Sequence, residues 1–131
     1  MNTLPAAIWL DLLSKPYRFG ARGPHEYDCV GLMLEIERRL GREIPPWGSR
    51  PRLLHAAKEQ WERTDNPQPG DGILIHSTRP KWHIGVVTGG GYMIHAHQDI
   101  GYVVRERYNA FPWHNRIEGF YRWIGTMKAQ S

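Results

Sequence analysis

The sequence predicts an α+β domain in which N-terminal helices pack against a small antiparallel β-sheet. In the first half of the chain, apolar residues recur with the 3.6-residue period of amphipathic helices. After the turn-forming segment from Asn66 to Asp71, they fall into short runs separated by turn residues, a pattern typical of strands in a meander. Helices first and strands second favour an α+β fold. Because 131 residues fit one compact domain, we expect a single domain over residues 1–131.

Three helices are expected in the first half. The first is capped by Thr3 and should end near Ser14-Lys15-Pro16, the second begins at Cys29 and is stopped by Gly41, and the third runs from Arg52 to Trp61. The second has the most regular pattern, with a glycine at its end as a C-terminal stop. Its apolar positions are Leu32, Met33, Ile36 and Leu40, and its outward charged positions are Glu35, Glu37, Arg38 and Arg39.

Five strands are expected in the second half. Each is a short run rich in β-branched, aromatic or aliphatic residues, and glycine or proline separates several of them. The runs are Gly72 to Ile75, His83 to Val87, Tyr92 to Ala96, Tyr102 to Val104 and Phe120 to Ile124.

Composition limits the function classes. A single cysteine cannot form an intrachain disulfide. The net charge of +4 comes from scattered basic residues, and no recognised nucleic-acid-binding module is present, so nucleic acid ranks last among the partners considered. No stretch approaches the roughly 20 apolar residues of a membrane span. The first residues lack a basic leader, so we expect synthesis in the cytoplasm without a signal peptide.

Cys29 is the first candidate functional residue. Free cysteines most often pack as small hydrophobes, but this one follows Asp28 and precedes Gly31 at a helix entrance, where the backbone can approach a ligand. The positive end of the helix macrodipole and unpaired backbone N–H groups there favour thiolate over thiol. The position therefore indicates a nucleophile.

Two histidines follow on predicted strands. His83 and His95 are separated by the glycine turn Gly89 to Gly91. One cysteine, one histidine base and one orienting polar residue are the groups that thiol catalysis requires. His97 lies on the same strand face as His95, because strand residues i and i+2 share a side, so it is an alternative to His95 or an assistant to it. We assign no role to His25, His55 or His114, and a structural histidine is the commoner explanation for His76.

With these residues in place, the chain resembles the NlpC-type cell-wall cysteine peptidases of the papain-like superfamily, over about residues 15 to 125. The family pattern is an aromatic approach to the cysteine, a helix start, a strand entry, a histidine strand and a third polar residue. Each motif is weak singly, but the five in this order are specific. They are Tyr17-Arg18-Phe19-Gly20, Asp28-Cys29-Val30-Gly31, Pro69-Gly70-Asp71, His83-Ile84-Gly85 and Ile94-His95-Ala96.

The resemblance implies a papain-like, NlpC-type fold and a role for each residue. Cys29 is the nucleophile, His83 the general base and then acid, and His95 the residue that orients His83. Tyr17 is expected near the oxyanion, beside the Cys29 backbone N–H. Asp28 belongs to the same oxyanion and substrate region, as a helix cap rather than a proton carrier. No cofactor and no metal are required, and the implied substrate is a peptide amide of bacterial peptidoglycan.

The chain also departs from the family pattern. Family members usually have a small hydroxyl residue after the cysteine, where this chain has Val30. This substitution, the Gly41 to Pro45 exit from the helix and the missing leader resemble variants associated with phage tails. The implied partners are phage-tail proteins, and the implied location is a virion tail that acts on the cell wall after delivery.

Two alternatives remain open. Cys29 with His83, His95 and His97 is a possible zinc ligand set, but closely paired ligands are missing. The second alternative is that the domain keeps the fold but is a non-catalytic assembly module of a phage tail. The sequence does not identify the bond that is cut.

Overall fold

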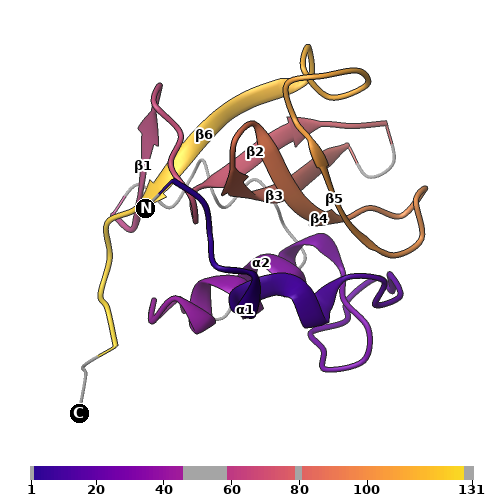
Figure 1. Ribbon diagram of the computed structural model, residues 1–131, viewed down its shortest axis with the longest axis horizontal. Coiled ribbons are helices and arrows are strands. Elements are labelled where there is room, and N and C mark those ends of the chain that lie inside the picture. The colour runs from indigo at the N-terminus through magenta and orange to yellow at the C-terminus, as the bar shows by residue number, and fades with distance from the viewer. Residues whose placement is uncertain (1, 46–58, 79–80, 129–131) are drawn as a thin grey trace.

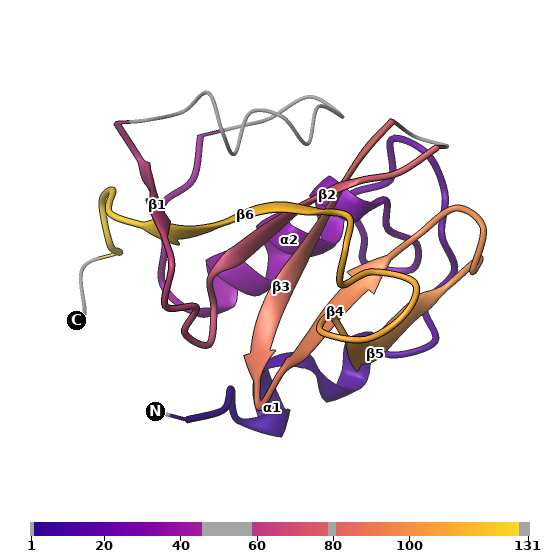
Figure 2. The same cartoon turned by 90° about the horizontal axis from the view of Figure 1, so that it is seen from above.

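Six strands form one antiparallel sheet. The computed structural model describes residues 2–45, 59–78 and 81–128. The strand order in the sheet is β1-β6-β2-β3-β4-β5, so β1 and β5 lie at opposite edges (Figure 2). The strands are β1 Trp61–Thr64, β2 Gly72–His76, β3 Trp82–Gly89, β4 Tyr92–Ala96, β5 Val103–Arg107 and β6 Ile117–Trp123.

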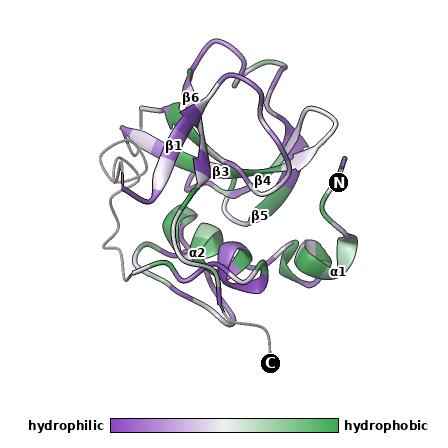
Figure 3. Ribbon diagram, turned by 90° about the vertical axis from the view of Figure 1, so that its left-hand side faces the viewer, coloured by the Kyte–Doolittle hydropathy of each residue, from purple (hydrophilic) through white to green (hydrophobic). Residues whose placement is uncertain are grey.

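The helices lie on one side of this sheet. They are α1 Ala6–Trp9, the 3-10 helix η1 Leu10–Leu12 and α2 Cys29–Arg39, and Figures 1 and 3 both show α1 and α2 beneath the strands. No helix in the described part of the chain is long and apolar enough to cross a membrane. The predicted α+β, papain-like arrangement of N-terminal helices on a small antiparallel sheet is confirmed.

Both faces of the sheet carry an apolar core. Between the sheet and the helices, residues of α2 such as Met33 and Ile36 pack with Ile84 and Ile94. On the other face, a second cluster is closed by Trp113 from the loop before β6. Strand alternation places His83 and His95 on this second face, whereas Cys29 belongs to the helix-side core. The cysteine and the histidines therefore approach the sheet from different sides.

The five predicted strands are confirmed, although all of them except β4 are longer than expected. The helix predicted from Arg52 to Trp61 lies outside the described residues up to position 58. At Trp61 the helix prediction is wrong, because this residue begins β1, pairs with Trp123 and is 2 % exposed. The two indole rings meet edge to face at 5.3 Å, and this packing overrides the helical pattern.

The first helix is shorter than predicted. Pro5 has extended backbone angles and the α-helix begins only at Ala6. Thr3 does not cap it, since Thr3 forms a β-bridge with Gly89, and Leu4 donates its N–H to the Thr88 carbonyl at 2.8 Å. A proline disfavours helical angles in the residue before it, so Leu4 stays extended and joins the sheet edge.

Helix α2 agrees with the prediction except at Glu37. Asp28 caps its start, and Gly41 follows its end with a positive φ of 87°. Glu37, predicted to face outward, is fully buried and ion-paired with Arg42, which also donates to the Gly70 carbonyl at 2.8 Å. Burial raises the pKa of Glu37 to about 7, although the Arg42 charge lowers it.

This shift predicts a pH-dependent stability. Because the pKa of Glu37 is higher folded than unfolded, its contribution to stability falls as pH rises from about 4.5 to about 7. Glu37→Gln does not titrate. We therefore expect the difference in unfolding free energy, wild type minus variant, to fall between pH 4 and pH 8 by on the order of 3 kcal/mol. Urea titrations at each pH measure it, and a difference that stays constant with pH contradicts the assignment.

Candidate active site

Asp28 fixes the backbone around Cys29. Its carboxylate accepts from the Gly31 N–H at 2.6 Å, from the Gly20 N–H at 3.0 Å and from the Arg22 guanidinium at 2.8 Å. The Asp28 side chain is almost fully buried, so these bonds make it a helix cap and a loop anchor. A Cβ on Gly31 would lie 2.2 Å from the Ala21 carbonyl oxygen, so only glycine lets the loop pass this close.

Cys29 is the first residue of α2 and its side chain is buried. Burial raises the pKa of the Cys29 thiol to about 12, although a hydrogen bond from the Ile84 backbone lowers it. The sequence-based expectation of a resting thiolate is therefore wrong. The helix N-terminus does favour the anion, but the loss of water around the sulfur outweighs it. The hydrogen bond with the Ile84 backbone places the thiol beside β3. Ile84 is the residue that follows His83 in the chain.

His83 and His95 are in direct contact. The Nε2 of His83 lies 2.7 Å from the Nδ1 of His95, and both side chains are fully buried. The pKa of His83 is well below its usual value, first because of burial and then because of the neighbouring His95 and His97. His83 is therefore a neutral imidazole at neutral pH, the form that accepts a proton.

Gly85 makes room for this contact. It lies on the same face of β3 as His83, and a Cβ there would stand 3.0 Å from the Met93 sulfur and 3.5 Å from the His95 Cβ. The β3–β4 ladder pairs Val86, Val87 and Gly89 only, so the strand ends that carry the histidines are outside it. The spacing of the His-x-Gly motif thus has a steric reason.

Tyr17 lies close to the thiol. The pKa of Tyr17 is raised to about 12, mainly by burial and in smaller part by the neighbouring Cys29 and Asp28, so the phenol keeps its proton. Its backbone N–H donates to the Gly101 carbonyl at 2.8 Å, which ties the loop before α2 to the loop after β4. The protonated Tyr17 side chain is a hydrogen-bond donor, and its place near an oxyanion stays a prediction.

Comparisons with known proteins decide the family. Residues 14–122 match the NlpC/P60 family. The chain belongs to the NlpC/P60 family. It is 31% identical over 110 residues to a protein of Listeria grayi called probable endopeptidase p60, and the match covers 84% of this chain and 20% of that protein. The chain therefore spans about a fifth of this relative's length.

Solved structures agree on the fold. NlpC1 of Trichomonas vaginalis has a TM-score of 0.71 at 23% identity, over 92% of this chain and 43% of that one. The NlpC/p60 domain of the peptidoglycan hydrolase SagA has a TM-score of 0.64 at 21% identity, over 88% of this chain and 92% of that one.

In this NlpC/P60 domain, His97 is held away from the His83–His95 bond. Its Nε2 lies 3.0 Å from the Ser77 hydroxyl, and its Nδ1 accepts the Asp99 N–H at 3.1 Å. Its ring packs edge to face against His83 at 4.7 Å. His97 therefore forms a wall of the site, and His95 is the residue that bonds to His83.

Two residues of the site were missed by sequence reasoning. The Glu106 carboxylate lies 2.7 Å from the Nε2 of His95, and Trp113 packs against all three histidine rings at 5.1 to 5.9 Å. Val104 pairs with His95, and Glu106 follows two residues later on the same strand face. Extending the predicted strand past Val104 would have indicated Glu106. No sequence signal indicated Trp113, which comes from an irregular loop.

Of the six ring nitrogens of His83, His95 and His97, five have hydrogen-bond partners among the described residues. The Nδ1 of His83 is buried and has none. The zinc alternative assigned these histidines to a metal, but nowhere in 2–45, 59–78 or 81–128 do three His, Cys, Asp or Glu side chains form a group that could hold one.

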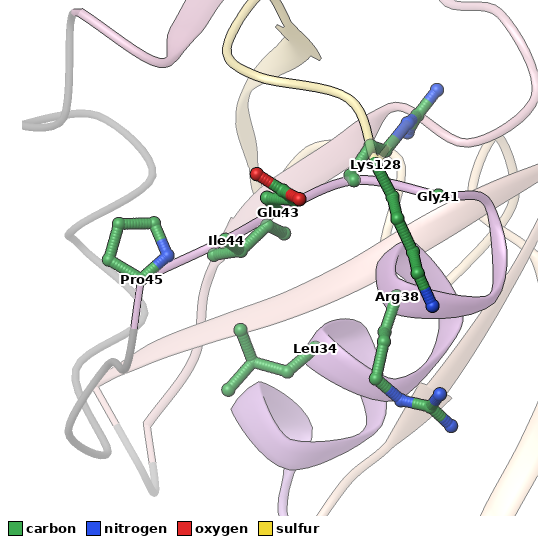
Figure 4. Close-up of a pocket in the computed structure, with 8 residues that line it drawn as sticks. Leu34, Arg38, Gly41, Glu43, Ile44, Pro45 and Lys128 are labelled. Carbon is green, nitrogen blue, oxygen red and sulfur yellow. The ribbon is translucent and has the colours of Figure 1, made fainter. Parts of the chain in front are cut away.

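The remaining sequence candidates lie outside this cluster. His25 and His114 are exposed, and His76 stacks against Trp82 with ring centroids 4.0 Å apart. His55 is outside the described residues. A cavity of about 350 Å³ opens at the other end of α2, lined by Leu34, Arg38, Lys128 and neighbours (Figure 4), and no candidate catalytic residue lines it.

The anchoring of the loop before Cys29 can be tested with two arginines. Arg22 binds the buried Asp28, whereas Arg18 in the same loop binds the more exposed Glu26. We expect Arg22→Ala to lower the unfolding free energy by about 1–2 kcal/mol, because it removes a bond to a buried charge. Arg18→Ala should change it by less than about 0.5 kcal/mol. Thermal unfolding of both variants measures the difference, and equal losses contradict the role of Arg22.

Proposed function

We propose that this domain is a cysteine peptidase that hydrolyses an amide bond in the stem peptides of bacterial peptidoglycan. The observation that carries the proposal is the unpaired Nδ1 of His83, buried in a site whose other histidine nitrogens are all bonded. An unpaired buried nitrogen costs about 1–3 kcal/mol, and a base that takes up a thiol proton requires such a nitrogen. Cys29 is hydrogen-bonded to the backbone of Ile84, the residue after His83, and we propose that its thiol gives its proton to this nitrogen.

Support for the substrate comes from the family. One relative is named a probable endopeptidase and one structural neighbour a peptidoglycan hydrolase. We propose an amide between stem-peptide residues as the bond, and the experiment below identifies which one.

The reaction is acyl transfer through a thioester. The Cys29 sulfur attacks the carbonyl carbon while its proton moves to the Nδ1 of His83. The oxyanion accepts hydrogen bonds from the Cys29 backbone N–H and the Tyr17 hydroxyl. Collapse of this intermediate breaks the C–N bond, and His83 gives its proton to the leaving amine. Water then attacks the thioester while His83 takes one of its protons, and the C–S bond breaks to release the carboxylic acid as His83 returns that proton to the Cys29 sulfur.

His95 orients the base throughout. Its bond to the Nε2 of His83 leaves the Nδ1 of His83 directed away from β4 and available to the thiol. As His83 becomes an imidazolium, this bond also stabilises the added charge. The triad of the proposal is therefore Cys29, His83 and His95.

The alternative is a non-catalytic assembly module of a phage tail. The His83–His95 hydrogen bond together with a His83 Nδ1 that has no partner among the described residues supports the peptidase instead. The association with a phage or phage-like tail, and the location in one, stay predictions. Val30 was one of the residues on which these two predictions are based. It is fully buried in the helix-side core and therefore has a packing role in this fold.

Digestion of purified peptidoglycan tests the proposed function. Wild-type protein should release stem-peptide fragments, and mass spectrometry of the soluble fraction identifies the bond. Cys29→Ala should release none, because it lacks the nucleophile, and Cys29→Ser serves as the matched variant that keeps the shape of the side chain. Fragments from Cys29→Ala at the wild-type rate would sink the proposal, and so would none from folded, reduced wild type.

The pH dependence of the digestion follows from His83. The base acts only when neutral, and burial holds the pKa of His83 well below its usual value of about 6.5. We therefore expect kcat/KM to keep its plateau as pH falls through 6.5 and to decline only at lower pH. Initial rates from pH 4 to pH 9 measure the profile. An acid limb centred at 6.5 or above contradicts this environment of His83.

A further inference from the structure

Glu106 occupies the far end of the histidine pair. It lies on β5, the edge strand beside β4, and its Oε2 is 2.7 Å from the Nε2 of His95 (Figure 2). The carboxylate is about one-third exposed, whereas the imidazole it contacts is fully buried. The contact extends the His83–His95 bond outward to the solvent edge of the sheet.

Glu106 acts as a hydrogen-bond acceptor at neutral pH. The bond with His95 is the main cause that holds its pKa below the usual value. An ionised carboxylate has acceptor sites only. The proton of the Glu106–His95 bond must therefore belong to the Nε2 of His95.

The position of the proton in the His83–His95 bond follows from its position in the Glu106–His95 bond. A neutral imidazole has one N–H and one lone pair. With its proton on Nε2, a neutral His95 presents a lone pair at Nδ1, so the hydrogen bond at 2.7 Å must carry a proton from the Nε2 of His83. A neutral His83 that donates from Nε2 keeps its lone pair on Nδ1. This is the nitrogen that is buried and unpaired.

If the protons on the two histidines were arranged the other way round, the Nδ1 of His83 could not act as a base. If the partner of His95 were a donor, the Nε2 of His95 would be the acceptor, and its Nδ1 would donate to the Nε2 of His83. The proton of His83 would then sit on Nδ1, where none can be accepted from the thiol. His97 offers no substitute acceptor, since its two nitrogens are engaged with Ser77 and Asp99.

We propose that Glu106 is a positioning residue that sets the tautomers of His95 and His83, so that the Nδ1 of His83 is the free base. The relay is then Glu106, His95, His83 and Cys29 in spatial order. This inference rests on the proposed thiol chemistry, but it does not depend on peptidoglycan as the substrate.

The tautomers can be observed directly. Long-range ¹H–¹⁵N correlation spectra of the ¹⁵N-labelled protein distinguish a protonated ring nitrogen from a bare one. In the wild type at pH 7, we expect His83 and His95 both to carry their proton on Nε2. A proton on Nδ1 of His83, or a doubly protonated His95, would overturn the proposal without any variant being made.

Glu106→Gln is the decisive substitution, because the amide keeps the shape of the side chain but can donate as well as accept. We expect part of the His83 population to move its proton to Nδ1, and the alkylation rate of Cys29 by iodoacetamide to fall about 10- to 100-fold. Glu62→Gln, an exposed position on β1 at the opposite edge, is the matched control and should leave both readouts unchanged. Wild-type tautomers and alkylation rate in Glu106→Gln would refute the role.

A second variant separates positioning from folding. Glu106→Ala removes the acceptor, and its site is exposed enough for a small carboxylate to enter. Added formate should restore the wild-type tautomers and at least part of the alkylation rate, whereas chloride at the same ionic strength should not. No difference between the two salts contradicts the proposal. Because these readouts use no peptidoglycan, they are independent of the digestion that tests the proposed function.

Discussion

The hydrogen bond between His83 and His95 is the contact on which the architecture of the site depends. It joins two neighbouring strands at ends that their common ladder does not pair, so it adds a side-chain link to the backbone pairing that each strand makes on its other side. Gly85 leaves the space beneath His95, and Trp113 closes the face above both rings. Loss of either support would free the rings to rotate, and the direction of the Nδ1 of His83 would no longer be fixed.

The thiol reaches this pair from the opposite face of the sheet. Cys29 is part of the helix-side core, and Asp28 and Gly31 determine where the first turn of α2 begins. Two separate cores therefore position the two proposed partners, and the thiol contacts the β3 backbone at Ile84, the residue after His83. Two cores allow the histidines and the cysteine to be buried independently, and so each pKa is set by its own surroundings.

Much of this could be predicted from the sequence because the patterns involved are local. The helix at Cys29, the strands that carry His83 and His95, and the Asp28 cap follow from periodicity and turn chemistry within a few residues. Glu106 and Trp113 could not be predicted in this way, since they reach the site only through strand pairing and a loop far along the chain. Trp61 fits a helical pattern locally, and its partner Trp123 decides otherwise.

The errors about charge have a common physical cause. The sequence places Glu37 on the outward face of a helix and Cys29 at a helix N-terminus, and each position by itself favours the ionised group. In the fold both side chains are buried, and desolvation raises both pKa values. Burial of Glu37 is offset by Arg42, which keeps the helix attached to the Gly70 turn. No cation faces Cys29 among the partners that set its pKa, so in the proposed mechanism the thiol ionises as its proton passes to His83. In that mechanism, the ionised Glu106 at the edge of the site is the counter-charge for the imidazolium that forms.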